Sequence, residues 1–173
     1  DARWTTTAIV MEPILEPGSM LGVLGGGQLG AMFTGAARRM GYRVAVWDPD
    51  SDAPAHRIAD QSFSTSFADH DTRERFVDSV HAITLEWENI PVELCRWLEQ
   101  RRPLRPSSAV LRILQDRLTQ KQFLSSCSIP VPDFAEVPSV HQLHHVIKRL
   151  GLPLTCNAAT RGYDGKGHWL FRQ

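Results

Sequence analysis

The chain has 173 residues, which is enough for one full α/β domain and part of a second. The 19 basic residues balance the 19 acidic ones, so no net field favours nucleic acid or an anionic membrane as a partner. Apolar residues make up 42% of the chain but occur in short runs, none near the ~20 residues that span a bilayer. We expect a soluble protein that acts on small molecules.

The cysteines and the first residues indicate a cytoplasmic location. Cys95, Cys127 and Cys156 are widely spaced and form no CxxC pair, which argues against a disulfide framework and against a structural zinc site. Residues 1–19 contain two prolines and lack the basic start and long apolar core of a secretion signal. They are expected to form a disordered leader.

From residue 20 onward, strand and helix signals alternate, which is typical of crossover units that build a parallel sheet. Strands are expected at 21–24, 44–47 and 82–85, and helices at 29–40, 71–80 and 91–100. This pattern predicts a Rossmann-like domain over residues 20–106. The segment 101–108 contains two prolines and is expected to be the connector at the domain boundary.

A second, incomplete domain is predicted over residues 107–173. It begins with a mostly helical segment, 109–126, and an extended segment, 129–132, because each proline disfavours helix at the residue before it. Ser139 is expected to cap a helix that ends at Gly151. Two strands, at 154–156 and 168–171, then flank a glycine-rich loop.

The first glycine motif is compatible with several ligands. Gly25, Gly27 and Gly30 follow a strand and open a helix, and Asp48 ends the next strand. This context fits a dinucleotide fingerprint, so an NAD(P)-dependent oxidoreductase is one hypothesis. A ribose phosphate suits the turn equally, because the helix N-terminus at residues 28–29 offers free N–H groups to an anion. A tight turn without a ligand is the third interpretation.

The second glycine motif, residues 162–167, places three glycines and Lys166 between two expected strands. Such a loop can turn its amides toward phosphate oxygens and close over a nucleotide. An ordinary hairpin explains the same residues equally well. The loop is not a P-loop, because neither Ser nor Thr follows the lysine.

Two polar segments lie between the glycine motifs. In the run 115–121, Asp116 with Gln120 and Arg117 with Lys121 are polar i, i+4 neighbours, and a solvated helical face explains them most simply. Glu86 and Glu88 flank Trp87 at the end of a predicted strand. We expect Trp87 to be buried there, and two carboxylates beside it then need polar partners. Since carboxyl ends of parallel strands line ligand crevices, this segment is interpreted as functional.

Taken together, four segments resemble the carboxyaminoimidazole ribonucleotide synthase family of ATP-grasp ligases. They read GGGQLG at 25–30, LEWENIP at 85–91, QDRLTQKQ at 115–122 and GYDGKG at 162–167. The resemblance implies an α/β fold, with a Rossmann-like pre-ATP-grasp domain followed by the beginning of an ATP-grasp domain. It also implies an enzyme that uses ATP, magnesium and bicarbonate to carboxylate aminoimidazole ribonucleotide in purine biosynthesis, and it allows a homodimer.

The resemblance further implies which residues bind ligands. The expected ATP contacts are Arg117, Asn157, Gly162, Tyr163, Asp164, Gly165, Lys166, Gly167 and His168. The ribonucleotide is expected to face Gly27, Gln28, Leu29 and Glu86. Asn157 stands where the family has an ATP-binding lysine. Its neutral side chain removes a charge-assisted contact worth roughly 1.5 to 3 kcal/mol, which predicts weaker ATP binding.

The resemblance covers less than half of a full family member. The magnesium-binding carboxylates and the residues that hold bicarbonate are expected in the absent part, so no metal ligand and no useful turnover are expected from these residues. A non-catalytic nucleotide-binding module therefore stands beside the oxidoreductase as an alternative.

Overall fold

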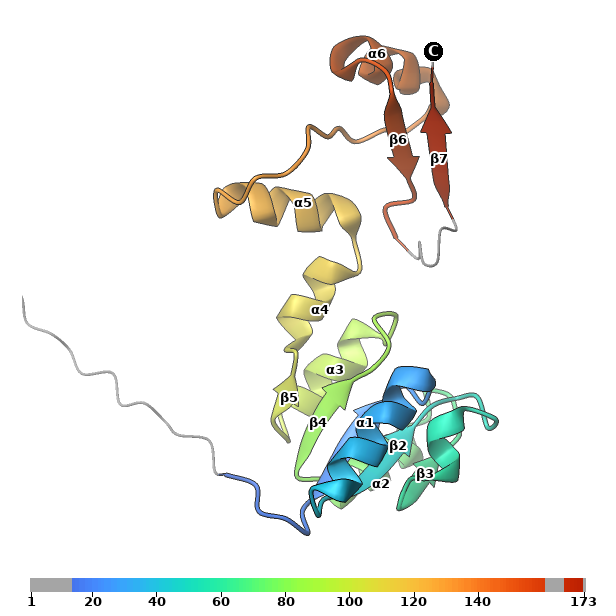
Figure 1. Ribbon diagram of the computed structural model, residues 1–173, viewed down its shortest axis with the longest axis vertical. Helices are drawn as coiled ribbons and strands as arrows, with labels where there is room; N and C mark the ends of the chain where they lie inside the picture. Colours follow the sequence, from blue (N-terminus) through green and yellow to red (C-terminus); the bar gives the residue numbers. More distant parts are fainter. Residues whose placement is uncertain (1–13, 161–166, 173) are drawn as a thin grey trace, which may run out of the picture.

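The computed structural model describes residues 14–160 and 167–172 (Figure 1). Its elements, in chain order, are β1 (Met20–Leu24), α1 (Gln28–Arg39), β2 (Arg43–Trp47), the 3-10 helix η1 (Pro54–Arg57), β3 (Gln61–Phe63), α2 (His70–Ser79), β4 (Ala82–Leu85), α3 (Val92–Glu99), β5 (Leu104–Arg105), α4 (Ser108–Leu114), α5 (Arg117–Ser126), α6 (Val140–Leu150), β6 (Leu154–Asn157) and β7 (His168–Phe171). The predicted α/β class is confirmed.

The strands β1 to β5 form a parallel sheet with the order β3-β2-β1-β4-β5. One face packs against α2, α3 and α4 in a cluster that contains the fully buried Trp47 and Phe76. The other face packs against α1 and η1 around Val23, Val44 and Val46. Burial on both faces is typical of parallel sheets and explains the continuous apolar runs of the central strands.

Two short strands and a helix break were not predicted. β5 lies inside the segment taken as a connector, where the buried Leu104 extends the sheet beside Ile83 of β4. β3 has only three residues and no alternating pattern long enough to detect. The helix predicted over 109–126 is divided into α4 and α5, because the Asp116 carboxylate accepts the Thr119 N–H at 2.6 Å and starts a new helix.

The described end of the expected leader is attached to the sheet domain. The Gly18 N–H donates to the Gly41 carbonyl at 2.7 Å, and the Tyr42 hydroxyl donates to the Leu15 carbonyl at 2.9 Å. Residues 14–19 are therefore attached to the sheet domain by these contacts. Residues 1–13 lie outside the described part of the chain.

The two parts of the chain differ in burial. α4 packs on α3, and its Leu111 belongs to the core of the sheet domain, so packing groups α4 with the first domain. From residue 115 onward, no described residue is fully buried. The second part presents exposed apolar side chains, including Phe123, Val140 and Trp169. Throughout the described ranges, no helix is both long and apolar enough to cross a membrane.

Candidate functional site

The first glycine turn is shaped around Glu86. Gly25 has a φ of +98°, and a Cβ there would lie 2.5 Å from Glu86 Oε2 and 3.1 Å from the backbone N of Trp87. A Cβ at Gly27 would lie 2.8 Å from Glu86 Oε1, and one at Gly30 would lie 2.7 Å from the Gly25 carbonyl oxygen. Gly25 and Gly27 are therefore needed because the Glu86 carboxylate, just after β4, packs directly on the turn after β1, and Gly30 is needed because the turn folds back on it.

Asp48 has a structural role in this turn. Its carboxylate accepts the Gly26 N–H at 2.6 Å through one oxygen and the Asp50 N–H at 2.8 Å through the other. The aspartate that suggested a ribose contact in a dinucleotide fold is thus used to close the glycine turn. This geometry removes the main observation behind the oxidoreductase hypothesis.

Glu86 has an anchored backbone and a side chain that is unpaired within the described part of the chain. Its N–H donates to the Leu24 carbonyl at 2.8 Å, which fixes the residue beside the end of β1. The side chain is half-buried, yet its carboxylate has no hydrogen-bond or ion-pair partner within residues 14–160 and 167–172. A carboxylate is an acceptor only, so without a donor among the described residues it is available to a ligand that carries N–H or O–H groups.

The start of α1 completes this part of the site. Gly27 is the N-cap, without a side-chain cap, and the first turn contains no acidic residue. Its N–H groups and the helix dipole therefore favour an anion at residues 28–29. Leu29 is 64% exposed. The structure thus brings the predicted ribonucleotide residues Gly27 and Glu86 into contact and places Gln28 and Leu29 next to them.

The loop after β4 is linked to the start of α5 through Gln115. Its side-chain amide donates to the carbonyls of Glu88 and Ile90, each at 2.7 Å. The solvated helical face predicted for residues 115–121 is therefore wrong for Gln115. Its only sequence signal is its position at the end of α4, where a side chain can reach back to a neighbouring loop. Two of the four family segments are therefore in direct contact.

Arg117 is held at the base of the second glycine loop. Its backbone N–H donates to the Ala159 carbonyl at 2.8 Å, and Asp116 forms an isolated β-bridge with Thr160. The Thr119 backbone N–H and hydroxyl, which both donate to Asp116, hold the pKa of this carboxyl below its ordinary value. The third family segment thus adjoins the strand that leads into the fourth.

Asn157 and His168 face one another across the β6–β7 hairpin. They are register partners, and Asn157 Oδ1 lies 2.6 Å from His168 Nδ1. The Ala158 N–H donates to the Gly167 carbonyl at 2.7 Å, and Gly167 has a φ of +70°. Asn157, Gly167 and His168 of the predicted ATP set therefore lie at the two strand ends, and Arg117 lies at the start of α5. Gly162, Tyr163, Asp164, Gly165 and Lys166 lie outside the described residues.

Trp87 differs from the expectation of burial. It is 47% exposed, because the chain leaves the sheet immediately after Glu86 and the side chain stands beyond the core.

Among the described residues no group of three or more His, Cys, Asp or Glu side chains is arranged to hold a metal. In Figure 1, the end of β6 and the start of β7 point toward the side where the β4–α3 loop lies.

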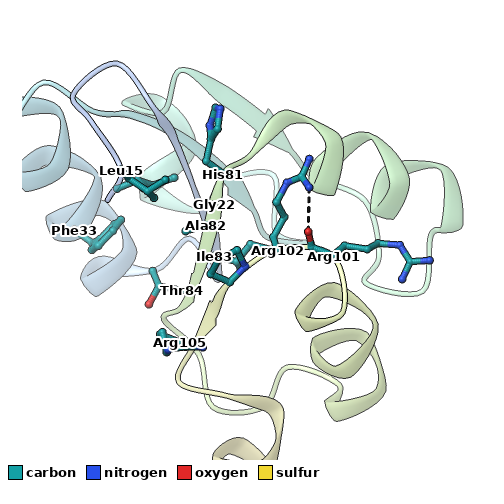
Figure 2. A pocket seen from close by; sticks show the side chains of 12 residues that line it. Leu15, Gly22, Phe33, His81, Ala82, Ile83, Thr84, Arg101, Arg102 and Arg105 are labelled. Carbon is teal, nitrogen blue, oxygen red and sulfur yellow. Dashed lines mark hydrogen bonds between the residues drawn. The ribbon is translucent and has the colours of Figure 1, made fainter. Parts of the chain in front are cut away.

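A separate cavity of about 470 Å³ lies away from this site (Figure 2). It is lined by residues of β1 and β4, by Phe33 of α1 and by the segment that enters β5. Figure 2 shows Arg102 donating to the Arg101 carbonyl at its rim, a contact of 3.0 Å. None of the predicted ligand-binding residues lines it.

Comparison with known families agrees with this geometry. The ribonucleotide synthetase preATP-grasp domain matches residues 19–115, and the ATP-grasp domain matches residues 122–173. The chain belongs to the ribonucleotide synthetase preATP-grasp family. The predicted resemblance is thereby confirmed, and the comparisons give no support to an oxidoreductase.

Individual relatives are more specific. N5-carboxyaminoimidazole ribonucleotide synthase of Bacillus subtilis is 34% identical over 162 residues, which cover 94% of this chain and 43% of the relative. The Pseudomonas aeruginosa protein of the same name is 37% identical over 153 residues, or 88% of this chain and 42% of that protein. The chain therefore spans less than half the length of these relatives.

Solved structures give the same result. The ADP complex of N5-carboxyaminoimidazole ribonucleotide synthetase purK superposes with a TM-score of 0.89 at 35% identity, covering 94% of this chain and 43% of that one. The Aspergillus clavatus synthase in complex with ADP and 5-aminoimidazole ribonucleotide gives a TM-score of 0.78 at 26% identity, with 91% and 41% coverage.

Proposed function

We propose that this chain provides the ribonucleotide-binding turn and the first ATP-binding elements of an ATP-dependent ligase. The ligase carboxylates the exocyclic amine of 5-aminoimidazole ribonucleotide with bicarbonate, in purine biosynthesis. The observation that carries the proposal is the Glu86 carboxylate, which packs on the glycine turn without a partner among the described residues. The names of the relatives, and the ligands of the Aspergillus clavatus complex, support the choice of substrate.

The two ends of the turn suit different parts of the ribonucleotide. The uncapped N–H groups at residues 28–29 favour the phosphate, because they combine free donors with the positive end of α1. The Glu86 carboxylate accepts hydrogen bonds only, so it suits a hydroxyl or amine of the substrate. We infer that these groups orient the substrate with its amine toward the second part of the chain.

We propose that the nucleotide binds beside the β6–β7 hairpin and not at the glycine turn. Arg117 is fixed by its backbone beside Ala159, and Asn157 and His168 lie at the strand ends of the glycine loop. We propose that Arg117 and the loop 162–168 contact ATP and that Asn157, a neutral side chain engaged with His168, weakens the interaction. Bound ATP would supply the phosphoryl group that activates bicarbonate, while these residues hold its phosphates.

Three further features belong to the same proposal. Magnesium is proposed as a cofactor because phosphoryl transfer depends on a positioned metal ion. A cytoplasmic location is supported by Cys95, Cys127 and Cys156, all of which are thiols and not disulfides. A homodimer is supported only by the exposed apolar side chains of the second part, and light scattering tests it directly.

Calorimetric titration tests the ribonucleotide half of the proposal. The chain should bind 5-aminoimidazole ribonucleotide, and Glu86→Gln should weaken binding by about tenfold, since hydrogen bonds to a charged group contribute roughly 1.5 to 3 kcal/mol. Glu88→Gln is the matched control, because Glu88 is an exposed carboxylate of the same loop. Equal affinities of the two variants, or no binding by the unchanged chain, would refute the assignment.

The ATP half needs its own titration. Asn157→Lys should tighten ATP binding by about tenfold or more, as expected for a cation placed against a phosphate. Asn157→Ala separates this effect from loss of the His168 contact, because it removes the hydrogen bond without adding charge. If the lysine and alanine variants bind ATP equally, Asn157 does not face the nucleotide.

A further inference from the structure

Trp87 adjoins the proposed ribonucleotide site through its backbone and has an exposed side chain. Trp87 follows Glu86 at the carboxyl end of β4, and its backbone N and Cβ each lie 3.1 Å from the Cβ position of Gly25. The residue is therefore fixed against the glycine turn through its backbone. Its side chain nevertheless remains 47% exposed.

The other described tryptophans of the sheet domain have aromatic or cationic neighbours. Trp47 is fully buried, with ring centroids of Phe67 and Phe76 at 5.3 and 5.5 Å. The guanidinium carbons of Arg73 and Arg101 lie 4.0 and 3.7 Å from the ring centroid of Trp97. Trp87 makes no ring or cation contact of this kind among the described residues.

Such an indole is chemically suited to a flat heterocycle. Stacking of an aromatic side chain on a nucleobase-like ring contributes ~1 to 3 kcal/mol of binding free energy per ring. A solvent-exposed indole without such a partner lacks this contribution. The adjacent Glu86 is a hydrogen-bond acceptor, and α1 begins with uncapped N–H groups. An aromatic face, an acceptor and an anion site thus lie on consecutive segments around one turn.

We propose that Trp87 determines specificity for the ring of the ribonucleotide by stacking on its aminoimidazole, while the start of α1 binds the phosphate. The inference rests on the proposed function, because that function places the ribonucleotide, and not ATP, at this turn. Trp87 then discriminates between the substrate and ribose phosphates that lack the ring. The adenine of ATP is the other aromatic ring that could stack on Trp87, but under the proposed function ATP binds at the β6–β7 hairpin.

The test is a titration of the 173-residue chain with two ligands, 5-aminoimidazole ribonucleotide and ribose 5-phosphate. The unchanged chain should bind the ribonucleotide more tightly. Trp87→Ala should weaken ribonucleotide binding by about fivefold or more and leave ribose 5-phosphate binding unchanged. Trp87→Phe, which keeps an aromatic face, should retain most of the affinity.

Trp169→Ala is the control, because Trp169 is 55% exposed on β7 and should affect neither ligand. Thermal melts of each variant report folding. Equal ribonucleotide affinity of Trp87→Ala and the unchanged chain, or parallel loss of both ligands with folding intact, would overturn the stacking role. Ribonucleotide and ribose 5-phosphate binding equally to the unchanged chain would also overturn it and leave the phosphate site standing. Binding of neither ligand would refute the proposed function itself.

Discussion

Replacing each of three glycines by alanine should separate strain, ligand binding and helix propensity. Gly25→Ala combines a φ of +98° with a Cβ only 3.1 Å from the backbone of Trp87, which cannot move aside like a side-chain end. The backbone strain costs about 1 to 3 kcal/mol and the overpacking a similar amount. We expect a loss of about 2 to 6 kcal/mol in the free energy of unfolding.

The other two substitutions are the internal controls. Gly27 has an ordinary φ of −64°, and its added Cβ meets the Glu86 carboxylate, which can swing away. Gly27→Ala should therefore change stability by less than about 1 kcal/mol while weakening ribonucleotide binding. Gly35 lies inside α1 with nothing within 4 Å of its added Cβ, so Gly35→Ala should stabilise by about 0.5 to 1 kcal/mol.

Urea unfolding followed by tryptophan fluorescence measures these differences, because Trp47 is fully buried in the sheet domain. The expected order of stability is Gly35→Ala, unchanged chain, Gly27→Ala and Gly25→Ala. A Gly25→Ala variant as stable as the unchanged chain would show that the turn is not packed on Trp87 as described. A Gly27→Ala variant with unchanged ribonucleotide affinity would show that displacing Glu86 does not matter for binding.

Three further outcomes are expected. Burial raises the pKa of the Cys95 thiol to about 12, so at pH 8 Cys95 should stay unreacted with a thiol reagent in the folded chain, while the exposed Cys127 reacts. Asp116→Ala should lower stability by about 0.5 to 2 kcal/mol through loss of the α5 cap, whereas Asp116→Asn should retain most of it. Because the pKa of Asp116 is lowered in the fold, its charge adds to the free energy of unfolding above pH ~4, and this contribution is lost as the pH falls through the folded pKa. Acid titration of the alanine variant, compared with the unchanged chain, detects the loss. Gln115→Ala removes two donors from the carbonyls of Glu88 and Ile90, and hydrogen exchange of that loop should increase.

The sheet domain was predictable because its strands and helices carry long periodic signals. β1, β2 and β4 are apolar runs ended by turn residues, and α1 ends beside Gly41, whose positive φ matches a stop signal. β3 and β5 contain three and two residues, too few for any periodic pattern. Their positions depend on pairing with strands distant in sequence, which local patterns do not encode.

The site was only partly predictable. The glycine motif predicted that a ligand approaches the backbone closely. In the structure, the side chain of Glu86 occupies this position against the glycines. The spacing of Asp48 imitated a dinucleotide site, because a carboxylate at that strand end also fits a role in closing the turn. Gln115 gave no motif signal, since its partners are main-chain carbonyls, and carbonyls are present at every residue.

The hydrogen bonds of Gln115 connect the end of α4 to the loop after β4, and the Arg117 N–H connects α5 to the end of β6, so they link two parts that differ in burial. The sheet domain has its own core, whereas the described residues after 114 have no fully buried side chain. The position of the β6–β7 end relative to the glycine turn is therefore set by few contacts, chiefly those to Glu88, Ile90 and Ala159. A ligand that contacts both the glycine turn and the β6–β7 end would add to these hydrogen bonds. Part of its binding free energy would then be lost in fixing the distance between the two. Under the proposed function, we therefore expect weak binding of the ribonucleotide or ATP alone and tighter binding of the two together.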